Sequence, residues 1–438
     1  MARLHASSIV VIVLALGIAA PAKLGAQTAG QIRPPVPNST GSSDRARRPA
    51  AEPPIEAVEV EGAERTRPAV VLDAVGLVPS RLLSKDAFER AARKLDELPA
   101  ASSTELTQRP ATNGSVRVKA TIRERALMPK GLADWAVVGG RALFVGEMKI
   151  DIAGPFGAGE VFSSTFRWAK NRPRVAFGLA VPDLGPLPGV TRFEVAWEPQ
   201  TYGIVPTGAD AFRETRQRAG VGVGDWASSW LAWHAGTAFD RFEDRNHVAF
   251  NAGVDVRLMS DLLAIMLGTE TWVPTNGGSR FTATNLAAAW RSSRDLAPPW
   301  TAIVGTTIAT DAAPMALWPG ASAGRGRGVL LRAHPLHSHG IVTSEVFGRR
   351  IAYATLERQH VVKTMSMATI GVAGFVDAAQ VWRRGTDFAS SPFHVDIGGG
   401  LRINAAKTGG MVRVDVGYGL RDGNVKLSAG WMESWPRR

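Results

Sequence analysis

The sequence contains no cysteine and only three tyrosines, and past its N-terminus it holds no apolar run long enough for a transmembrane helix. The lack of cysteine excludes disulfides, zinc–thiolate sites and thiol nucleophiles. Hydrophobic residues still make up 45% of the 438-residue chain, although its mean hydropathy is only −0.02. Apolar and polar residues are therefore interleaved, which is typical of a soluble protein or of a membrane barrel with alternating strands.

Common catalytic motifs are also missing, including G-x-S-x-G, the Walker loop and H-E-x-x-H. The stretch Gly324–Gly328 does not follow a strand and open a helix, so it is not a dinucleotide-binding loop. His334, His337 and His339 form a His-rich tract, but no nearby acid completes a ligand set. We therefore expect no enzyme activity, no catalytic residue, no cofactor and no metal. A hydrolase assembled from scattered Ser and His residues remains an open alternative.

Residues 1–26 have the pattern of a secretory signal peptide. Arg3 supplies the positive start, and Ser8–Ala20 is an apolar stretch too short to span a membrane as a helix. Cleavage after Ala22 and cleavage after Ala26 both fit, and an uncleaved anchor is the alternative. The net charge of +12 comes from basic residues scattered along the chain. Together with the export signal, this scatter argues against a nucleic-acid partner.

Two segments separate the signal from the rest of the chain. Residues 27–53 are rich in Pro, Ser, Gly and Arg, so we expect a disordered Pro-rich tether. Residues 54–124 predict a compact α+β unit with the order strand, helix, helix, strand, strand. Its second helix begins after Ser84, a good N-cap. Asn113-Gly114 predicts the hairpin between the last two strands.

Period-2 alternation dominates the chain after residue 142. Ionisable groups occupy the second face of many segments, as expected for a barrel with lipid outside and a polar lumen inside; a two-sheet sandwich is the alternative. The expected strands are 143–152, 160–169, 173–182, 190–198, 212–223, 229–240, 246–258, 262–273, 281–291, 300–310, 351–361, 368–382, 393–404, 411–420 and 424–432, with 135–141 ambiguous.

These strands predict a mainly β protein with a transmembrane antiparallel barrel over residues 135–438. Bacterial barrels have even strand numbers, so about 16 strands are expected, and 14 is the alternative. The long interval 311–350 lacks a clear strand and should form the dominant loop. Several tryptophans, such as Trp272, fall near strand ends, where membrane barrels carry aromatic girdles.

The C-terminal motifs resemble the BamA/TamA-type outer-membrane assembly and translocation superfamily, also called the bacterial surface antigen family. Gly374–Trp382 resembles a family strand with Phe, an apolar residue, Asp and a small residue, and Val395–Arg402 and Val412–Val416 resemble the next two strands. Residues 54–124 are similar to a single POTRA domain, whose first strand ends as Val60–Gly62 does. Gly154–Glu160 resembles the early hairpin turn of such barrels.

In this family a long inward loop carries an Arg-Gly-aromatic motif, whose Arg pairs with acids of the barrel wall. The best match is Leu331–His334, which supplies Arg332 but has Ala and His where the family has Gly and an aromatic residue. Arg325 and Arg327 are rivals for the same role.

The strand periodicity supports two wall acids as partners of this arginine. Glu357 and Asp377 each share a face with polar or aromatic neighbours, and Phe375 shares the face of Asp377. Both acids should therefore point into the lumen, where a carboxylate needs a partner and an Arg offers a rigid fork. We hypothesise that Arg332 bridges Glu357 and Asp377 and pins the loop; ordinary lumen charges are the alternative.

The resemblance implies a protein of the outer membrane with its N-terminal domain in the periplasm, and a function in inserting or translocating polypeptides. The implied partners are outer-membrane lipids, unfolded outer-membrane or secreted polypeptides, and periplasmic accessory proteins. A passive porin or structural barrel without assembly activity is the alternative, because a shared fold does not establish a shared function.

Overall fold

The structure is a computed structural model. It describes residues 52–128, 139, 146–203, 211–295, 297–320, 331–343, 346–365, 368–382, 391–405 and 410–433. The expected signal peptide, almost all of the tether, and the ambiguous stretch 135–141 apart from residue 139 lie outside these ranges. Among the described residues, no helix is long and apolar enough to cross a membrane.

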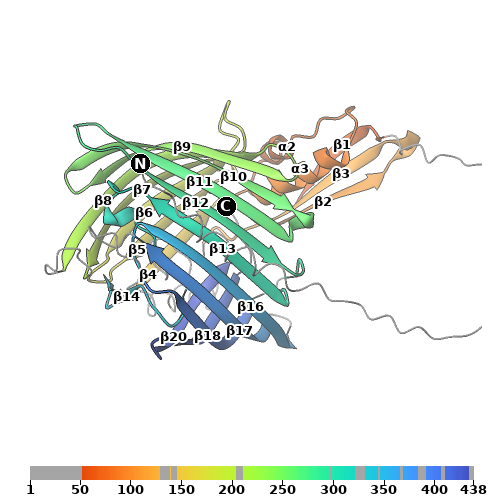
Figure 1. Cartoon of the computed structure of the whole chain (residues 1–438). Coiled ribbons are helices and arrows are strands. Elements are labelled where there is room, and N and C mark those ends of the chain that lie inside the picture. Colours follow the sequence, from red (N-terminus) through yellow and green to blue (C-terminus); the bar gives the residue numbers. More distant parts are fainter. Residues whose placement is uncertain are drawn as a thin grey trace, which may run out of the picture. The chain divides into compact units, whose positions relative to one another are not determined.

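The small N-terminal domain is a three-stranded sheet with two helices. Its elements are β1 (Ile55–Glu61), α2 (Pro68–Val75), α3 (Lys85–Asp96), β2 (Ala101–Pro110) and β3 (Val116–Glu124). The strand order is β1-β3-β2, with β1 parallel and β2 antiparallel to the central β3 (Figure 1). The predicted α+β order is therefore confirmed.

Local sequence signals explain the helices of this domain. Ser84 caps α3, and its hydroxyl accepts a hydrogen bond from the backbone N of Ala87 at 3.1 Å. A cap of this kind stabilises a helix by about 1 kcal/mol. Ala91 and Leu95 follow on one face of α3 and are buried with Val71 of α2 in the core of the domain.

The rest of the described chain forms a closed barrel in which each long strand is antiparallel to its sequence neighbour. Fifteen long strands are described: β4 (Glu147–Ala153), β5 (Val161–Arg167), β6 (Arg174–Pro182), β7 (Val190–Tyr202), β8 (Phe212–Trp226), β9 (Leu231–Phe242), β10 (Arg245–Leu258), β11 (Leu263–Pro274), β12 (Phe281–Arg291), β13 (Trp300–Ala309), β16 (Arg350–Thr364), β17 (Ala368–Trp382), β18 (His394–Ala405), β19 (Gly410–Gly419) and β20 (Val425–Glu433). The predicted barrel of about 16 strands is confirmed.

The two faces of the wall have opposite chemistry. On β16 and β17, Glu357 and Asp377 point inward and are 3% and 0% exposed. Their sequence neighbours Leu356 and Val376 point outward and are 44% and 45% exposed. This polar-in, apolar-out dyad is the pattern that a barrel needs when its outer surface contacts lipid.

One tryptophan departs from the girdle pattern. Trp272 is almost fully buried, and its indole Nε1 donates to Asp240 at 2.8 Å inside the barrel. The girdle interpretation is therefore wrong for Trp272, because its position near a strand end did not reveal which face it takes. Trp168 and Trp197, by contrast, are exposed.

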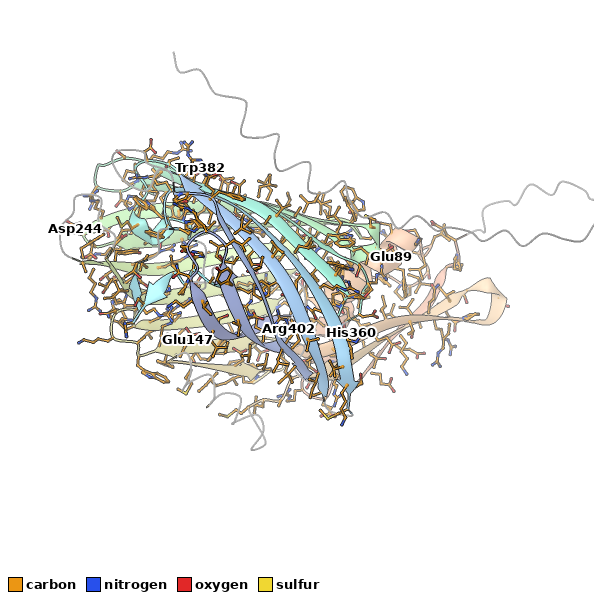
Figure 2. The ribbon with its side chains drawn as sticks, turned by 60° about the horizontal axis from the view of Figure 1, so that its bottom comes forward. Glu89, Glu147, Asp244, His360, Trp382 and Arg402 are labelled. Atoms are coloured by element: carbon orange, nitrogen blue, oxygen red, sulfur yellow. The ribbon has the colours of Figure 1, made fainter. Side chains whose placement is uncertain are left out.

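Because the strands are antiparallel, their turns alternate between two ends of the barrel. The turns 154–160 and 227–230 contact the small domain, so we call this the domain end. The segments 310–320, 331–343, 346–349 and 420–424 belong to the opposite end, the loop end. Asp244 and Trp382 mark the loop end in Figure 2, away from Glu89 of α3.

Helix α3 makes charged contacts with the domain end. Arg93 forms an ion pair with Asp261, which follows β10, and the Nζ of Lys94 lies 3.0 Å from a carboxylate oxygen of Asp225 on β8. Both acids have little exposed side chain. The contacts therefore place α3 against the turns of two separate hairpins.

The chain between β13 and β16 packs into the barrel. It contains the short helix η5 (Met315–Leu317) and two short strands, β14 (His337–Ser338) and β15 (Ile341–Val342). Val342 pairs with Tyr202 of β7. The buried residues of this segment and of the wall form one apolar cluster, which includes Trp318, Leu336, Val342, Phe347, Tyr202, Trp272 and Phe281.

Candidate functional site

The candidate site is an ion cluster where the loop meets the inner wall. Arg332 is buried, and its guanidinium lies between two wall acids of adjacent strands. Its Nη1 is 2.8 Å from Oε2 of Glu357, and its Nε is 3.1 Å from Oδ2 of Asp377. The structure thus brings together the arginine and both acids that the sequence pattern selected.

Phe375 completes the predicted set. The centre of the Arg332 guanidinium lies 3.7 Å from the centroid of the Phe375 ring, which is itself buried. A guanidinium stacks well on an aromatic face because its charge attracts the negative face of the ring. The ring therefore supports the arginine from one side while the acids hold its edge.

Sequence reasoning missed three members of the cluster, among them Arg402 on β18 and Asp415 on β19. Arg402 donates to both oxygens of Glu357, at 2.9 and 2.7 Å, and its Nη1 lies 2.5 Å from Asp415. Asp415 is also 3.6 Å from Nη1 of Arg332. Both residues stand on the inward-facing positions of their strands, and that alternation was the signal that could have identified them.

Counting Arg413, whose Nη1 is 3.4 Å from Asp415, the cluster holds three arginines and three acids. The acids are Glu357, Asp377 and Asp415. The charges balance in a site that is closed to solvent, so their mutual attraction offsets part of the desolvation cost of burying them. Removing one partner from such a pair costs about 3–5 kcal/mol, because it leaves an uncompensated buried charge.

Glycines of the wall give the loop room to approach. A Cβ at Gly417 of β19 would lie 2.9 Å from the backbone N of Ala333 and 2.9 Å from the backbone carbon of Arg332. A Cβ at Gly398 of β18 would lie 2.0 Å from the backbone oxygen of Val416 and 2.5 Å from the Phe375 ring. Side chains at either position would displace the loop or its supporting ring. The rival arginines, Arg325 and Arg327, lie outside the described residues.

A second cluster forms around His334, the residue after Ala333. The Nδ1 of His334 lies 2.7 Å from Asp396 of β18, and its Nε2 lies 2.8 Å from Asp422 in the turn between β19 and β20. No acid lay near His334 in the sequence, but the fold supplies these two. Burial opposes protonation, but the two carboxylates raise the pKa of His334 above its ordinary value.

The other histidines of the tract lie elsewhere. His337 belongs to β14, and the carbonyl of His339 accepts a hydrogen bond from Asn171 at 2.9 Å. The tract is therefore not a unit, and only its first histidine joins the wall beside the ion cluster. The ion cluster itself holds fixed charges and offers geometry for docking a loop, rather than a nucleophile with a neighbouring base.

These features together define a class, a barrel of the outer-membrane type with one small α+β domain and an inward-docked loop. No protein-family model matches the sequence, and no curated protein matches it. The structure is similar to CdiB from Escherichia coli, with a TM-score of 0.54 and 13% identity, over 87% of this chain and 76% of that chain.

Two further solved structures match over similar lengths. BamA from Haemophilus ducreyi lacking POTRA domains 1–3 gives a TM-score of 0.49 at 12% identity, over 87% of this chain and 85% of that chain. CdiB from Acinetobacter baumannii gives 0.47 at 11% identity, over 86% and 73%. The likeness to the Escherichia coli CdiB shows that this chain has the fold of such a barrel, as the C-terminal motifs indicated.

Proposed function

We propose that this chain is an outer-membrane barrel that inserts or translocates polypeptides, and that Arg332 holds its loop in the lumen. The observation that carries the proposal is the buried ion cluster of Arg332 with Glu357 and Asp377. A passive pore gains nothing from three arginines and three acids that fasten a loop across its interior. A barrel that opens for a client needs a loop that is docked at rest.

The small domain offers a surface for client capture. Strand β2 lies at an edge of the sheet, and in the described part of the chain it pairs only with β3. An extended segment can add to such an edge through backbone hydrogen bonds. In our proposal, unfolded outer-membrane or secreted polypeptides bind here, in the periplasm, where accessory proteins also have access to the domain.

The seam of the barrel offers a surface for insertion. Strands β20 and β4 are neighbours in the closed barrel. They contain 9 and 7 residues, whereas β16 and β17 contain 15 each. A short pairing has fewer backbone hydrogen bonds to break, and an opened edge can template a client strand. This supports opening at the seam next to outer-membrane lipids.

Client insertion tests the proposal. The mature chain, residues 27–438, would be reconstituted into liposomes, and folding of an added unfolded eight-stranded barrel protein would be followed by protease protection. We expect faster folding than in empty liposomes. Arg332→Ala should slow it at least about tenfold, because a loss of 3 kcal/mol or more undocks the loop. Deletion of residues 27–124 should also slow it.

A matched control separates the loop from general damage. Arg358→Ala removes an exposed arginine from β16, next to Glu357 but on the outer face, and should leave insertion unchanged. Folding no faster than in empty liposomes would reject the assembly function and favour the passive porin or structural barrel. A slow Arg358→Ala variant would reject the assignment to the loop.

A further inference from the structure

The cluster around His334 contains three donor atoms that converge on one point. The Nε2 of His334 lies 3.2 Å from Nδ1 of His394 and 2.8 Å from Oδ2 of Asp422. All three atoms lie within 4.8 Å of one another. Neighbouring ligands of a tetrahedral Zn²⁺ at about 2.0–2.1 Å are about 3.3 Å apart, and the separations of 3.2 and 2.8 Å lie close to that spacing.

The groups behind the donors fix their orientation. Asp396 is fully buried, and its carboxylate accepts from the backbone N of Ala333 at 2.6 Å and pairs with Nδ1 of His334 at 2.7 Å. A carboxylate behind a histidine in this way is the usual support of a metal ligand, since it fixes the tautomer and raises the basicity of the other nitrogen. Asn424 likewise holds Asp422 through its backbone N and its side chain.

The donor atoms face one another across a short gap. The Nε2 of His334 faces both a carboxylate oxygen of Asp422 and Nδ1 of His394. One cation placed between these atoms would therefore engage three residues at once.

We propose that His334, His394 and Asp422 bind a divalent transition-metal ion of the Zn²⁺ class, with Asp396 as the positioning residue behind His334. Two imidazoles and one carboxylate suit such an ion, whereas Ca²⁺ and Mg²⁺ prefer oxygen ligands. Asp422 is the most exposed of the three, so the ion enters from its side at the loop end. This site is not part of the proposed function. It also differs from the expectation, drawn from the sequence, that the chain binds no metal.

The bound ion would join three separate parts of the chain. His334 belongs to the inward loop, His394 begins β18, and Asp422 lies in the turn before the last strand, β20. The ion would therefore fasten the loop to the last hairpin of the barrel independently of Arg332. Zn²⁺ should slow the movement of the loop away from this hairpin.

Metal binding to the refolded, untagged mature chain tests the site. Zn²⁺ binding would be measured by competition with a chromophoric chelator, and Co²⁺ binding by its visible absorption, which is intense in tetrahedral sites. We expect one ion per chain. His394→Ala and Asp422→Asn should each weaken binding at least about tenfold, and Asp396→Asn about 10- to 100-fold. Mg²⁺ should not compete.

Controls keep the result specific. His360→Ala removes an exposed histidine of β16 and should bind Zn²⁺ as the wild type does. Each variant must first show the gel mobility of a folded barrel. Asp422→Asn changes a partly exposed turn, so it reports on the site even where His394→Ala fails to fold. Hydrogen exchange of residues 331–336 should slow with Zn²⁺ in the wild type but not in Asp422→Asn.

Two outcomes would overturn the site. Less than one ion per chain in the folded wild type would mean that a protonated His334 alone satisfies Asp396 and Asp422. Equal affinity of the wild type and Asp422→Asn would mean that the ion binds elsewhere.

Discussion

Arg332 combines interactions that no other side chain offers at once. Its planar guanidinium reaches Glu357 and Asp377 through different nitrogens and lies flat over Phe375. A lysine carries the same charge but presents it as a single point, so it satisfies one acid at a time. Arg332→Lys should therefore weaken loop docking, although less than Arg332→Ala does.

Gly417 gives a direct test of how closely the loop approaches the wall. The atoms that a Cβ would meet at 2.9 Å are backbone atoms of residues 332 and 333, which cannot rotate away. We expect Gly417→Ala to undock the loop. Because the chain has no native cysteine, a Leu336→Cys reporter in the buried cluster measures this as faster maleimide labelling.

The matched control for this experiment is Gly374→Ala. Gly374 faces outward from β17, and the nearest atom to an added Cβ is 3.9 Å away, which is an ordinary contact. Labelling of the reporter should stay slow in this variant. Slow labelling in Gly417→Ala as well would mean that the wall yields and the loop stays docked.

One carboxylate, that of Glu124, links the end of β3 to the segment that leads into α2. Glu124 at the end of β3 accepts hydrogen bonds from the backbone N of Thr66 at 2.7 Å and from Nε of Arg65 at 2.9 Å. Burial opposes its ionisation, but these bonds outweigh burial and lower the pKa of Glu124 below its ordinary value. The ionised form is therefore the one that stabilises this element.

The sign of the pH dependence follows from that lowered pKa. The contribution of Glu124 is fully present above the unfolded value of about 4.3 and is lost as the pH falls through the lower folded value. Glu124→Gln should reduce hydrogen-exchange protection of residues 62–75 at pH 7, by the roughly 1.5–3 kcal/mol of a charged hydrogen bond. It should also remove the acid-dependent loss of protection that we expect of the wild type.

Glu105→Gln is the control, because Glu105 is exposed on the edge strand β2. Protection factors corrected for intrinsic exchange should match the wild type at both pH values. An equal loss of protection in both variants would show that general charge, rather than the contacts of Glu124, sets the stability of this element.

The strands were predictable because their pattern is local. Lipid on one face and a polar lumen on the other impose a two-residue period, which is visible in Leu356 and Glu357 without knowledge of any neighbour. The site was predictable only in part. Arg402 and Asp415 join the ion cluster, and Asp422 joins His334, through strand order and loop register, which depend on contacts between residues far apart in the sequence. The prediction that Trp272 belongs to an aromatic girdle failed because proximity to a strand end does not determine which face of the strand a side chain takes.

Different interactions stabilise the two ends of the barrel. At the loop end, a buried ion cluster and an apolar cluster fasten the chain between β13 and β16. At the domain end, α3 relies on ion pairs with some solvent access, such as Arg93 with Asp261. Solvent screens pairs of the second kind more than the ion cluster, and we take about 1 kcal/mol, the upper end for surface pairs, as their contribution. The domain end should therefore open more readily than the loop end.

Single-channel recording in planar bilayers checks this difference. We expect the wild type to conduct rarely. Arg93→Ala should raise the open fraction about two- to fivefold, as a loss of 0.4–1 kcal/mol allows. Arg332→Ala should raise it at least about tenfold. Lys85→Ala in the same helix removes only a largely exposed pair with Glu89 and should change nothing. If the wild type conducts steadily and neither Arg93→Ala nor Arg332→Ala alters it, the interior contacts do not gate the lumen, and the chain is a passive barrel.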